Sequence, residues 1–224
     1  MTAPPRPSSD GWVVFLRGAN VGGRIFRPSQ LAQELPALGL VSIGAAGTFV
    51  ARTQAAAGTV RSALQAKLPF QAAIMVTPAR EIDRLLRAGP PQPHPLPPGV
   101  RNFVCVARAP LSNAVRLPIE VPSPSVWGVR VLAIDRQFAM GVCRRIEPRM
   151  VYPNEVVERA FGVETTTRWW ETLEAIGRIL SDTEAGPGGR GVRLDTPVVR
   201  PSRTPNNRPL RSRKPRVKRR GSAE

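Results

Sequence analysis

The stretch Trp12-Val13-Val14-Phe15-Leu16 decides how the fold begins, and it leads directly into Arg17-Gly18-Ala19-Asn20-Val21-Gly22-Gly23-Arg24-Ile25. An unbroken apolar run of this length is typical of a β-strand that is buried on both faces. Glycines let the backbone turn its N–H groups toward a ligand, and the two arginines add positive charge. The segment therefore predicts a strand followed by an anion-binding loop. Its candidate ligand-binding residues are Arg17, Gly18, Asn20, Gly22, Gly23 and Arg24.

A purely structural interpretation of the same loop stays open. The glycines also suit a tight turn between a strand and a helix, where they only supply positive φ angles. The loop lacks the Lys-Ser/Thr pair of a P-loop and the glycine spacing of a dinucleotide-binding loop. The sequence thus excludes those two nucleotide-binding motifs without deciding between an anion site and a turn.

The rest of the first part of the chain predicts short helices alternating with short strands. Leucines at helical spacing, glycines at helix ends and apolar runs mark these elements. We expect a helix opened by Pro28 and shortened by Pro36, a strand over 43–51, a helix around Val60, Leu64 and Leu68, a strand over 72–76, and a helix with Thr77 as N-cap and Pro78 in its first turn.

Six prolines between residues 90 and 98 predict a stiff connector, which we place at 90–100 as the boundary between subdomains 11–89 and 101–182. Beyond it we expect strands over 103–107, 127–134 and 138–143, a turn over 135–137, a helix capped by Asn154, and a last helix from Arg168 to Leu180. Because each half mixes helices with short strands, the sequence favours an α+β fold over a doubly wound parallel sheet.

The start of the last expected helix is a second candidate anion site. Thr167 suits the N-cap position, and an anion there would gain from the exposed N–H groups and from Arg168. The neighbouring Trp169 and Trp170 offer either a stacking surface for nucleic-acid bases or core packing, and the area that a tryptophan buries favours the core.

The positive charge of the chain is concentrated at its C-terminal end. The chain has 33 Lys and Arg against 16 Asp and Glu, a net charge of +17, and residues 187–224 alone hold 12 basic and 2 acidic residues. Periodicity disappears there, so we expect residues 183–224, like residues 1–10, to be disordered. A tail of this kind binds phosphates of nucleic acids without sequence preference, unless it is only a solvated end without a partner. Its densest basic residues are Arg211, Arg213, Lys214, Arg216, Lys218, Arg219 and Arg220.

Residues for familiar catalytic chemistry are scarce. The single histidine, His94, lies in the proline-rich connector, and Cys105 and Cys143 lie in apolar runs that predict buried, inert thiols. No spacing suggests a metal site, so we expect no metal and no cofactor. The N-terminus lacks the apolar core of a signal peptide, and no apolar stretch approaches the roughly 20 residues of a membrane span, which favours a cytoplasmic protein. Whether the chain is an enzyme, and its oligomeric state, stay undecided.

With these segments in place, the chain resembles the bacterial family called domain of unknown function 1697. The family has an N-terminal Leu-Arg-Gly-x-Asn-Val-Gly-Gly, matched here by 16–23, and a C-terminal Thr-Thr-Arg-Asn-Trp-Asn-Thr-Val, matched in part by Thr166, Thr167, Arg168, Trp170 and Thr172. The resemblance covers about residues 12–180 and implies two ferredoxin-like plait subdomains. It implies no activity.

The chain also departs from that family. Ala46-Gly47-Thr48 stands where the family usually has Ser-Gly-Asn, Trp169 and Glu171 replace two asparagines, and Val151 stands at the place of a usual lysine. If the missing polar side chains form a site in relatives, this chain has a different ligand or has lost the activity.

Three functional hypotheses follow. The leading one is an anion-binding or phosphate-binding α+β protein whose basic tail adds non-specific affinity for nucleic acid. The alternative is an enzyme that acts on an anionic or phosphorylated small molecule held between the subdomains by Arg17, Asn20 and Arg168. The third is an interaction module whose exposed sheet edge pairs with a strand of a partner.

Overall fold

The structure is a computed structural model that describes residues 11–18, 27–147 and 150–182. Several predictions from the sequence lie outside these residues. They concern the loop residues Asn20, Gly22, Gly23 and Arg24, the disorder of 1–10 and 183–224, and the basic tail over 211–220.

The first half is an antiparallel sheet with helices, in the order β1 (Trp12–Leu16), α1 (Pro28–Glu34), a 3₁₀ turn (Pro36–Leu38), β2 (Leu40–Ile43), β3 (Thr48–Ala51), α2 (Ala57–Lys67), β4 (Ile74–Pro78) and α3 (Ala79–Ala88). The strands lie side by side in the order β2-β3-β1-β4, and every pair is antiparallel. Pro36 ends α1, because proline has no N–H to continue the helix, and Gly39 follows in the left-handed conformation. These features confirm the predicted strand and shortened helix.

The second half is a larger antiparallel sheet, in the order β5 (Val100–Ala107), β6 (Ile119–Pro122), β7 (Trp127–Asp135), β8 (Phe138–Arg144), α4 (Pro153–Phe161), β9 (Thr165–Trp169) and α5 (Trp170–Asp182). Its strands lie in the order β6-β7-β8-β5-β9. The predicted turn between β7 and β8 is confirmed, with Arg136 in the left-handed region at a φ of 55°. The α+β class is therefore correct, with two antiparallel sheets.

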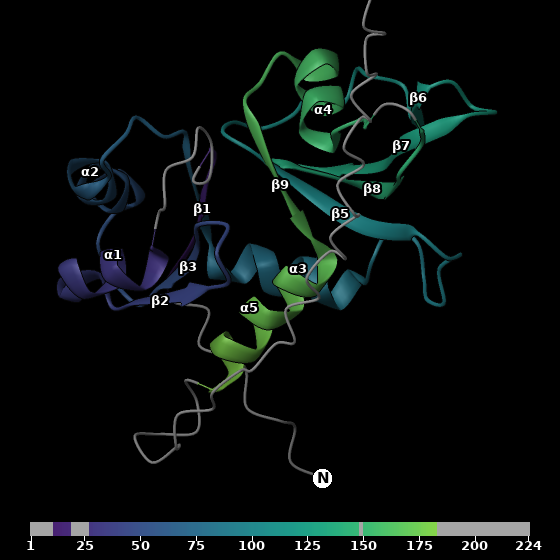
Figure 1. The fold of residues 1–224 in the computed structure, drawn as a ribbon. Helices are drawn as coiled ribbons and strands as arrows, with labels where there is room; N and C mark the ends of the chain where they lie inside the picture. Colours follow the sequence, from purple (N-terminus) through teal and green to yellow (C-terminus); the bar gives the residue numbers. More distant parts are fainter. Residues whose placement is uncertain (1–10, 19–26, 148–149, 183–224) are drawn as a thin grey trace, which may run out of the picture. The chain divides into compact units, whose positions relative to one another are not determined.

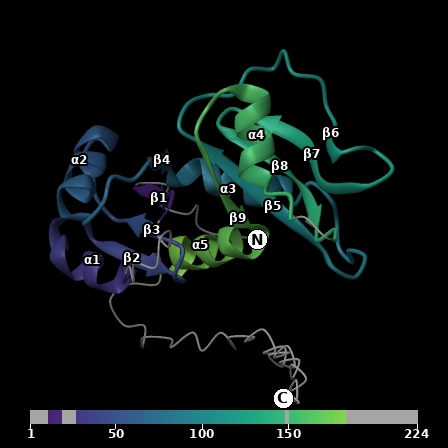
Figure 2. The same ribbon diagram turned by 45° about the horizontal axis from the view of Figure 1, so that its top comes forward.

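The two sheets share one hydrophobic core, which lies around α3 and α5 (Figure 1). Helices α1 and α2 cover the opposite face of the first sheet, and α4 covers the opposite face of the second (Figure 2). In β1, Val13 and Phe15 face the shared core, while Val14 and Leu16 face α1 and α2. All four are at most 1% exposed, as the unbroken apolar run predicts.

Four local predictions in the sequence are wrong. The strand expected over 43–51 is two strands of a hairpin, β2 and β3, because Gly44 and Gly47 have positive φ angles and turn the chain between them. Thr77 belongs to β4 and not to a helix cap, and the N-cap of α3 is Pro78. Asn154 lies inside α4, whose N-cap is Tyr152, with Pro153 in the first turn.

The fourth error concerns the last helix. Residues from Thr165 to Trp169 form β9, and α5 begins only at Trp170. A run of three threonines favours a strand, because their branched side chains fit a pleated surface. The short strand β6 was not expected at all.

Candidate functional site

Arg168 is the buried centre of the candidate site. It lies in β9, its exposed fraction is 6%, and its guanidinium lies against the end of β1, where the glycine-rich segment starts. Nε donates to the hydroxyl of Thr48 at 2.7 Å, and a terminal nitrogen donates to the hydroxyl of Thr166 at 2.8 Å. The other hydrogen bonds go to main-chain carbonyls of Leu16 at 2.9 Å, Ala46 at 2.8 Å, Gly47 at 3.3 Å and Thr167 at 2.8 Å.

The guanidinium therefore joins three segments that are far apart in the sequence. These are the end of β1, the turn between β2 and β3 (44–47) with Thr48, and β9. The hydroxyl of Thr166 adds a further bond to the carbonyl of Leu16, at 3.3 Å across 150 residues. The two sequence motifs that suggested an anion site, around Leu16 and around Arg168, thus meet in space.

The positive charge of Arg168 has no carboxylate within 4 Å among the described residues. Burial away from water lowers its pKa to about 10, so the side chain remains protonated at neutral pH. Burying a cation is costly unless hydrogen bonds compensate it, and here neutral oxygens do so. The junction consequently carries an unneutralised positive charge beneath the start of the glycine-rich segment.

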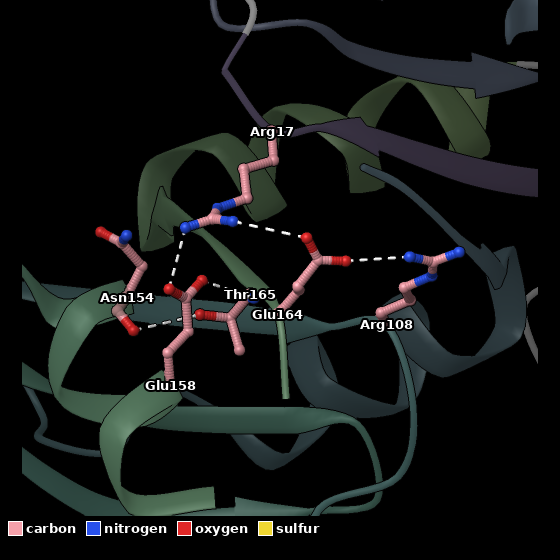
Figure 3. Close-up of polar contacts among 6 residues, drawn as sticks. All are labelled: Arg17, Arg108, Asn154, Glu158, Glu164 and Thr165. Carbon is pink, nitrogen blue, oxygen red and sulfur yellow. Dashed lines mark hydrogen bonds and ion pairs between the residues drawn. The ribbon is translucent and has the colours of Figure 1, made fainter. Parts of the chain in front are cut away.

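Arg17, the first residue after β1, lies in a network of opposite charges (Figure 3). Its guanidinium binds Glu158 of α4 at 2.8 Å and approaches Glu164 at 3.6 Å, and Arg108 binds Glu164 from the other side at 2.9 Å. Glu158 also accepts the N–H of Thr165 at 2.8 Å. Arg17 is thus bound by two carboxylates instead of standing free for an external anion.

The main chain before the loop is also engaged. The N–H of Leu16 donates to the carbonyl of Gly47 at 2.8 Å, and the N–H of Arg17 donates to the carbonyl of Ala73 at 2.9 Å. Gly18 has a φ of 76°, a left-handed conformation that reverses the direction of successive N–H groups. Free main-chain donors for an anion must therefore come from Gly18 onward.

The predicted helix start at Thr167 is wrong, and with it the reason for an anion there. Thr167 lies in the middle of β9, where its hydroxyl is 3.3 Å from the thiol of Cys105. The hydrogen bonds of Arg168 use Nε and both terminal nitrogens, all toward atoms of the chain itself. Trp170 is 3% exposed and belongs to the shared core, as the favoured interpretation of the tryptophan pair expected.

A hollow of about 460 Å³ lies between the two halves, on other residues. Thr77, Pro78, Arg80 and Glu81 line it from the first half, and Pro110, Leu111, Asn113, Arg136, Gln137 and Phe138 line it from the second. Glu81 is held there by Arg84 at 3.0 Å and by Arg136 at 2.6 Å. Neither Arg17 nor Arg168 lines this hollow, so the expected clamp of the enzyme hypothesis does not meet it.

Other reactive groups in the described part do not form a site. Burial raises the pKa of Cys105 to about 12 and that of Cys143 to about 11, so both thiols stay protonated. No group of three or more His, Cys, Asp or Glu side chains is placed to hold a metal in residues 11–18, 27–147 and 150–182. Among the described helices, none has the length and hydropathy that crossing a membrane requires.

In comparisons with known proteins, the chain matches no family model, no curated protein and no solved structure.

Sequence reasoning missed the acidic partners and the threonine hydroxyls of the site. Glu158 could not be singled out, because a sequence does not show that α4 packs beside the end of β1. A signal was present for Thr48 and Thr166, since both lie in segments that the comparison with the resembling family had singled out.

Proposed function

We propose that the protein binds a small anion, such as a phosphate group, through the glycine-rich segment that continues from Arg17. Gly18, Asn20, Gly22, Gly23 and Arg24 supply the ligand donors in this proposal. The observation that carries it is the buried cation of Arg168, which lies against Leu16 without a carboxylate within 4 Å in the described residues. A positive charge of that kind attracts an anion to the adjoining backbone.

The charges around the junction favour the same conclusion. Arg17 and Arg108 pair with Glu158 and Glu164, and Arg168 adds a third positive charge that has no carboxylate within 4 Å among the described residues. The group thus has a net charge of +1, which an anionic ligand neutralises. Arg17 and Arg168 act in this proposal as positioning residues, because their own donors bind the chain and not the ligand.

Titration of the full chain with pyrophosphate tests the proposal. Binding should raise the midpoint of thermal unfolding in a concentration-dependent way, since a ligand that binds only the folded state stabilises it. Arg24→Ala should weaken this binding about tenfold or more, because a charge-assisted hydrogen bond contributes roughly 1.5 kcal/mol or more. Arg87→Ala is the matched control, because Arg87 is exposed on α3 and pairs only with Asp83. Equal affinity of both variants would contradict the proposal.

A second function, non-specific binding of nucleic acid, rests on the basic tail. Residues 187–224 carry a net charge of +10, and cationic chains displace counterions from phosphates. Deleting 187–224 should reduce affinity for a DNA duplex and flatten its dependence on salt. Unchanged affinity and salt slope after the deletion would refute a role of the tail. A cytoplasmic location suits this function.

We also infer that both halves are ferredoxin-like plaits. The order β2-β3-β1-β4 with α1 after β1 and α2 after β3 supports this for the first half. In the second half, β7-β8-β5-β9 has the corresponding order, with β6 added at one edge and no helix between β5 and β7. Membership in the domain of unknown function 1697 family is part of the same proposal, and an experimental structure of a recognised family member tests both.

The interaction-module hypothesis has less support. The edge strands of the two sheets, β2, β4, β6 and β9, are only four or five residues long, so the described part offers no long free edge.

A further inference from the structure

The most exposed large hydrophobic side chains of the described part belong to two segments that meet at the start of β7. Val126, Met150 and Tyr152 are 54%, 54% and 48% exposed. A Cβ placed on Gly128 would be 3.2 Å from the side chain of Val151, so Val151 packs against the start of strand β7. Val126 is two residues before Gly128, and Met150 and Tyr152 flank Val151. Three exposed apolar residues thus belong to the two segments that meet at Gly128 and Val151, although exposed apolar groups are costly in water.

An arginine–tryptophan–arginine stack lies at the same end of β7. The guanidinium carbons of Arg130 and Arg144 lie 4.4 Å and 4.2 Å from the centre of the Trp127 ring. Nε of Arg144 donates to the carbonyl of Trp127 at 2.9 Å, which fixes the side chain on the ring. We call Val126, Trp127, Arg144, Met150 and Tyr152 the β7 patch.

The charge of the β7 patch is positive. Arg130 is neutralised by Glu120, whose carboxylate is 2.5 Å from its Nε. In the described part Arg144 has no carboxylate within 4 Å, and its side chain donates there through Nε and not through its terminal nitrogens. A guanidinium that is stacked and fixed in this way offers its outer edge to a phosphate at little entropic cost.

We propose that the β7 patch binds single-stranded nucleic acid. Unstacked bases lie on Tyr152 and the apolar side chains of Met150 and Val126, and a phosphate binds the terminal nitrogens of Arg144. Aromatic side chains beside arginines are the usual means of holding single strands without sequence preference. The net charge of +7 outside residues 187–224 favours a polyanion over an acidic peptide segment, which offers fewer charges per unit length. This proposal is independent of the anion site at Arg17–Arg24 and of the tail.

Photocrosslinking of the full chain to a 15-nucleotide oligothymidylate, followed by mapping of the crosslinked peptides, tests this proposal. Because the mapped peptides show where on the chain the oligonucleotide lies, binding through the tail does not obscure binding at the β7 patch. We expect crosslinks in the peptides that contain Trp127 and Tyr152. Tyr152→Ala should reduce the yield of these crosslinks at least fivefold, and Tyr152→Phe should retain it, since only the ring is needed for stacking.

Two variants of neighbouring arginines separate a specific contact from bulk charge. Arg144→Gln should reduce the crosslink yield in the β7 patch several-fold, whereas Arg145→Gln, whose side chain is exposed and paired with Glu147 at 2.8 Å, should change it little. Thermal unfolding of each variant verifies that it is folded. Crosslinks confined to residues 187–224, or equal yields for Arg144→Gln and Arg145→Gln, would overturn the proposal. Binding of an acidic peptide that oligothymidylate does not displace would also overturn it.

Discussion

Replacing Arg168 by alanine should destabilise the protein by about 3 kcal/mol. The guanidinium makes six hydrogen bonds, and charged bonds contribute roughly 1.5 kcal/mol each at the low end of their range, or about 9 kcal/mol together. The lowered pKa of about 10 corresponds to a burial cost of about 3 kcal/mol, which the substitution removes. Water reaches the part-buried carbonyls of Ala46 and Thr167 in the variant and recovers about 3 kcal/mol more.

Thermal unfolding followed by circular dichroism measures this effect. For a domain of this size, 3 kcal/mol lowers the midpoint by roughly 6–12 °C. Arg87→Ala is the control, because its exposed pair with Asp83 contributes about 0.5 kcal/mol, or roughly 1–2 °C. Arg168→Lys should fall between them, since an ammonium keeps the charge but loses the planar fork of donors. If Arg168→Ala unfolds within 2 °C of Arg87→Ala, the junction does not hold the three segments together.

Two further predictions concern close packing and a buried thiol. Gly141→Ala should cost more than about 4 kcal/mol and reduce the soluble yield, because its Cβ would lie 1.8 Å from the carbonyl oxygen of Arg130 on the neighbouring strand. Gly58→Ala in α2, where a Cβ meets no atom within 4 Å, should instead stabilise by about 0.5–1 kcal/mol, and a similar loss in both variants would refute this reasoning. Burial raises the pKa of Cys105 from 9.0 to about 12, so its contribution to stability is complete below pH 9 and decreases above it, by up to about 1.4 kcal/mol per pH unit. Urea unfolding at pH 8.5, 9.5 and 10 should show a smaller decrease in Cys105→Ala than in the wild type, and parallel slopes would count against the assignment.

Local patterns in the sequence predicted most elements, but not where strands turn or helices begin. The apolar run over 12–16 and the prolines that open and end α1 act on their own neighbours, so they could be interpreted without tertiary context. The hairpin around Gly44 and Gly47 was missed because an alternating run with glycines fits one weak strand as well as two short ones. The helical spacing from Trp169 to Leu180 extended the last helix backward into a segment that pairs with β5.

The candidate site was predictable only in part. The sequence singled out Leu16–Arg17 and Thr166–Arg168, and the structure brings these segments together. The sequence did not reveal that Arg168 points inward. This orientation follows from β9 being a strand, in which Arg168 lies on the same face as Thr166, two residues earlier. Nor did the sequence reveal the pairing of Arg17 with Glu158, which depends on a contact across 141 residues.

The shared core has a consequence for synthesis of the chain on the ribosome. Val13 and Phe15 are translated more than 150 residues before Trp170, Leu173 and Ile176, which pack in the same core. Until α5 is translated this core is therefore incomplete, although α3 already contributes Ile82 and Leu85, and the apolar surface that is left exposed invites aggregation. We expect the nascent chain to be most prone to aggregation until α5 leaves the exit tunnel.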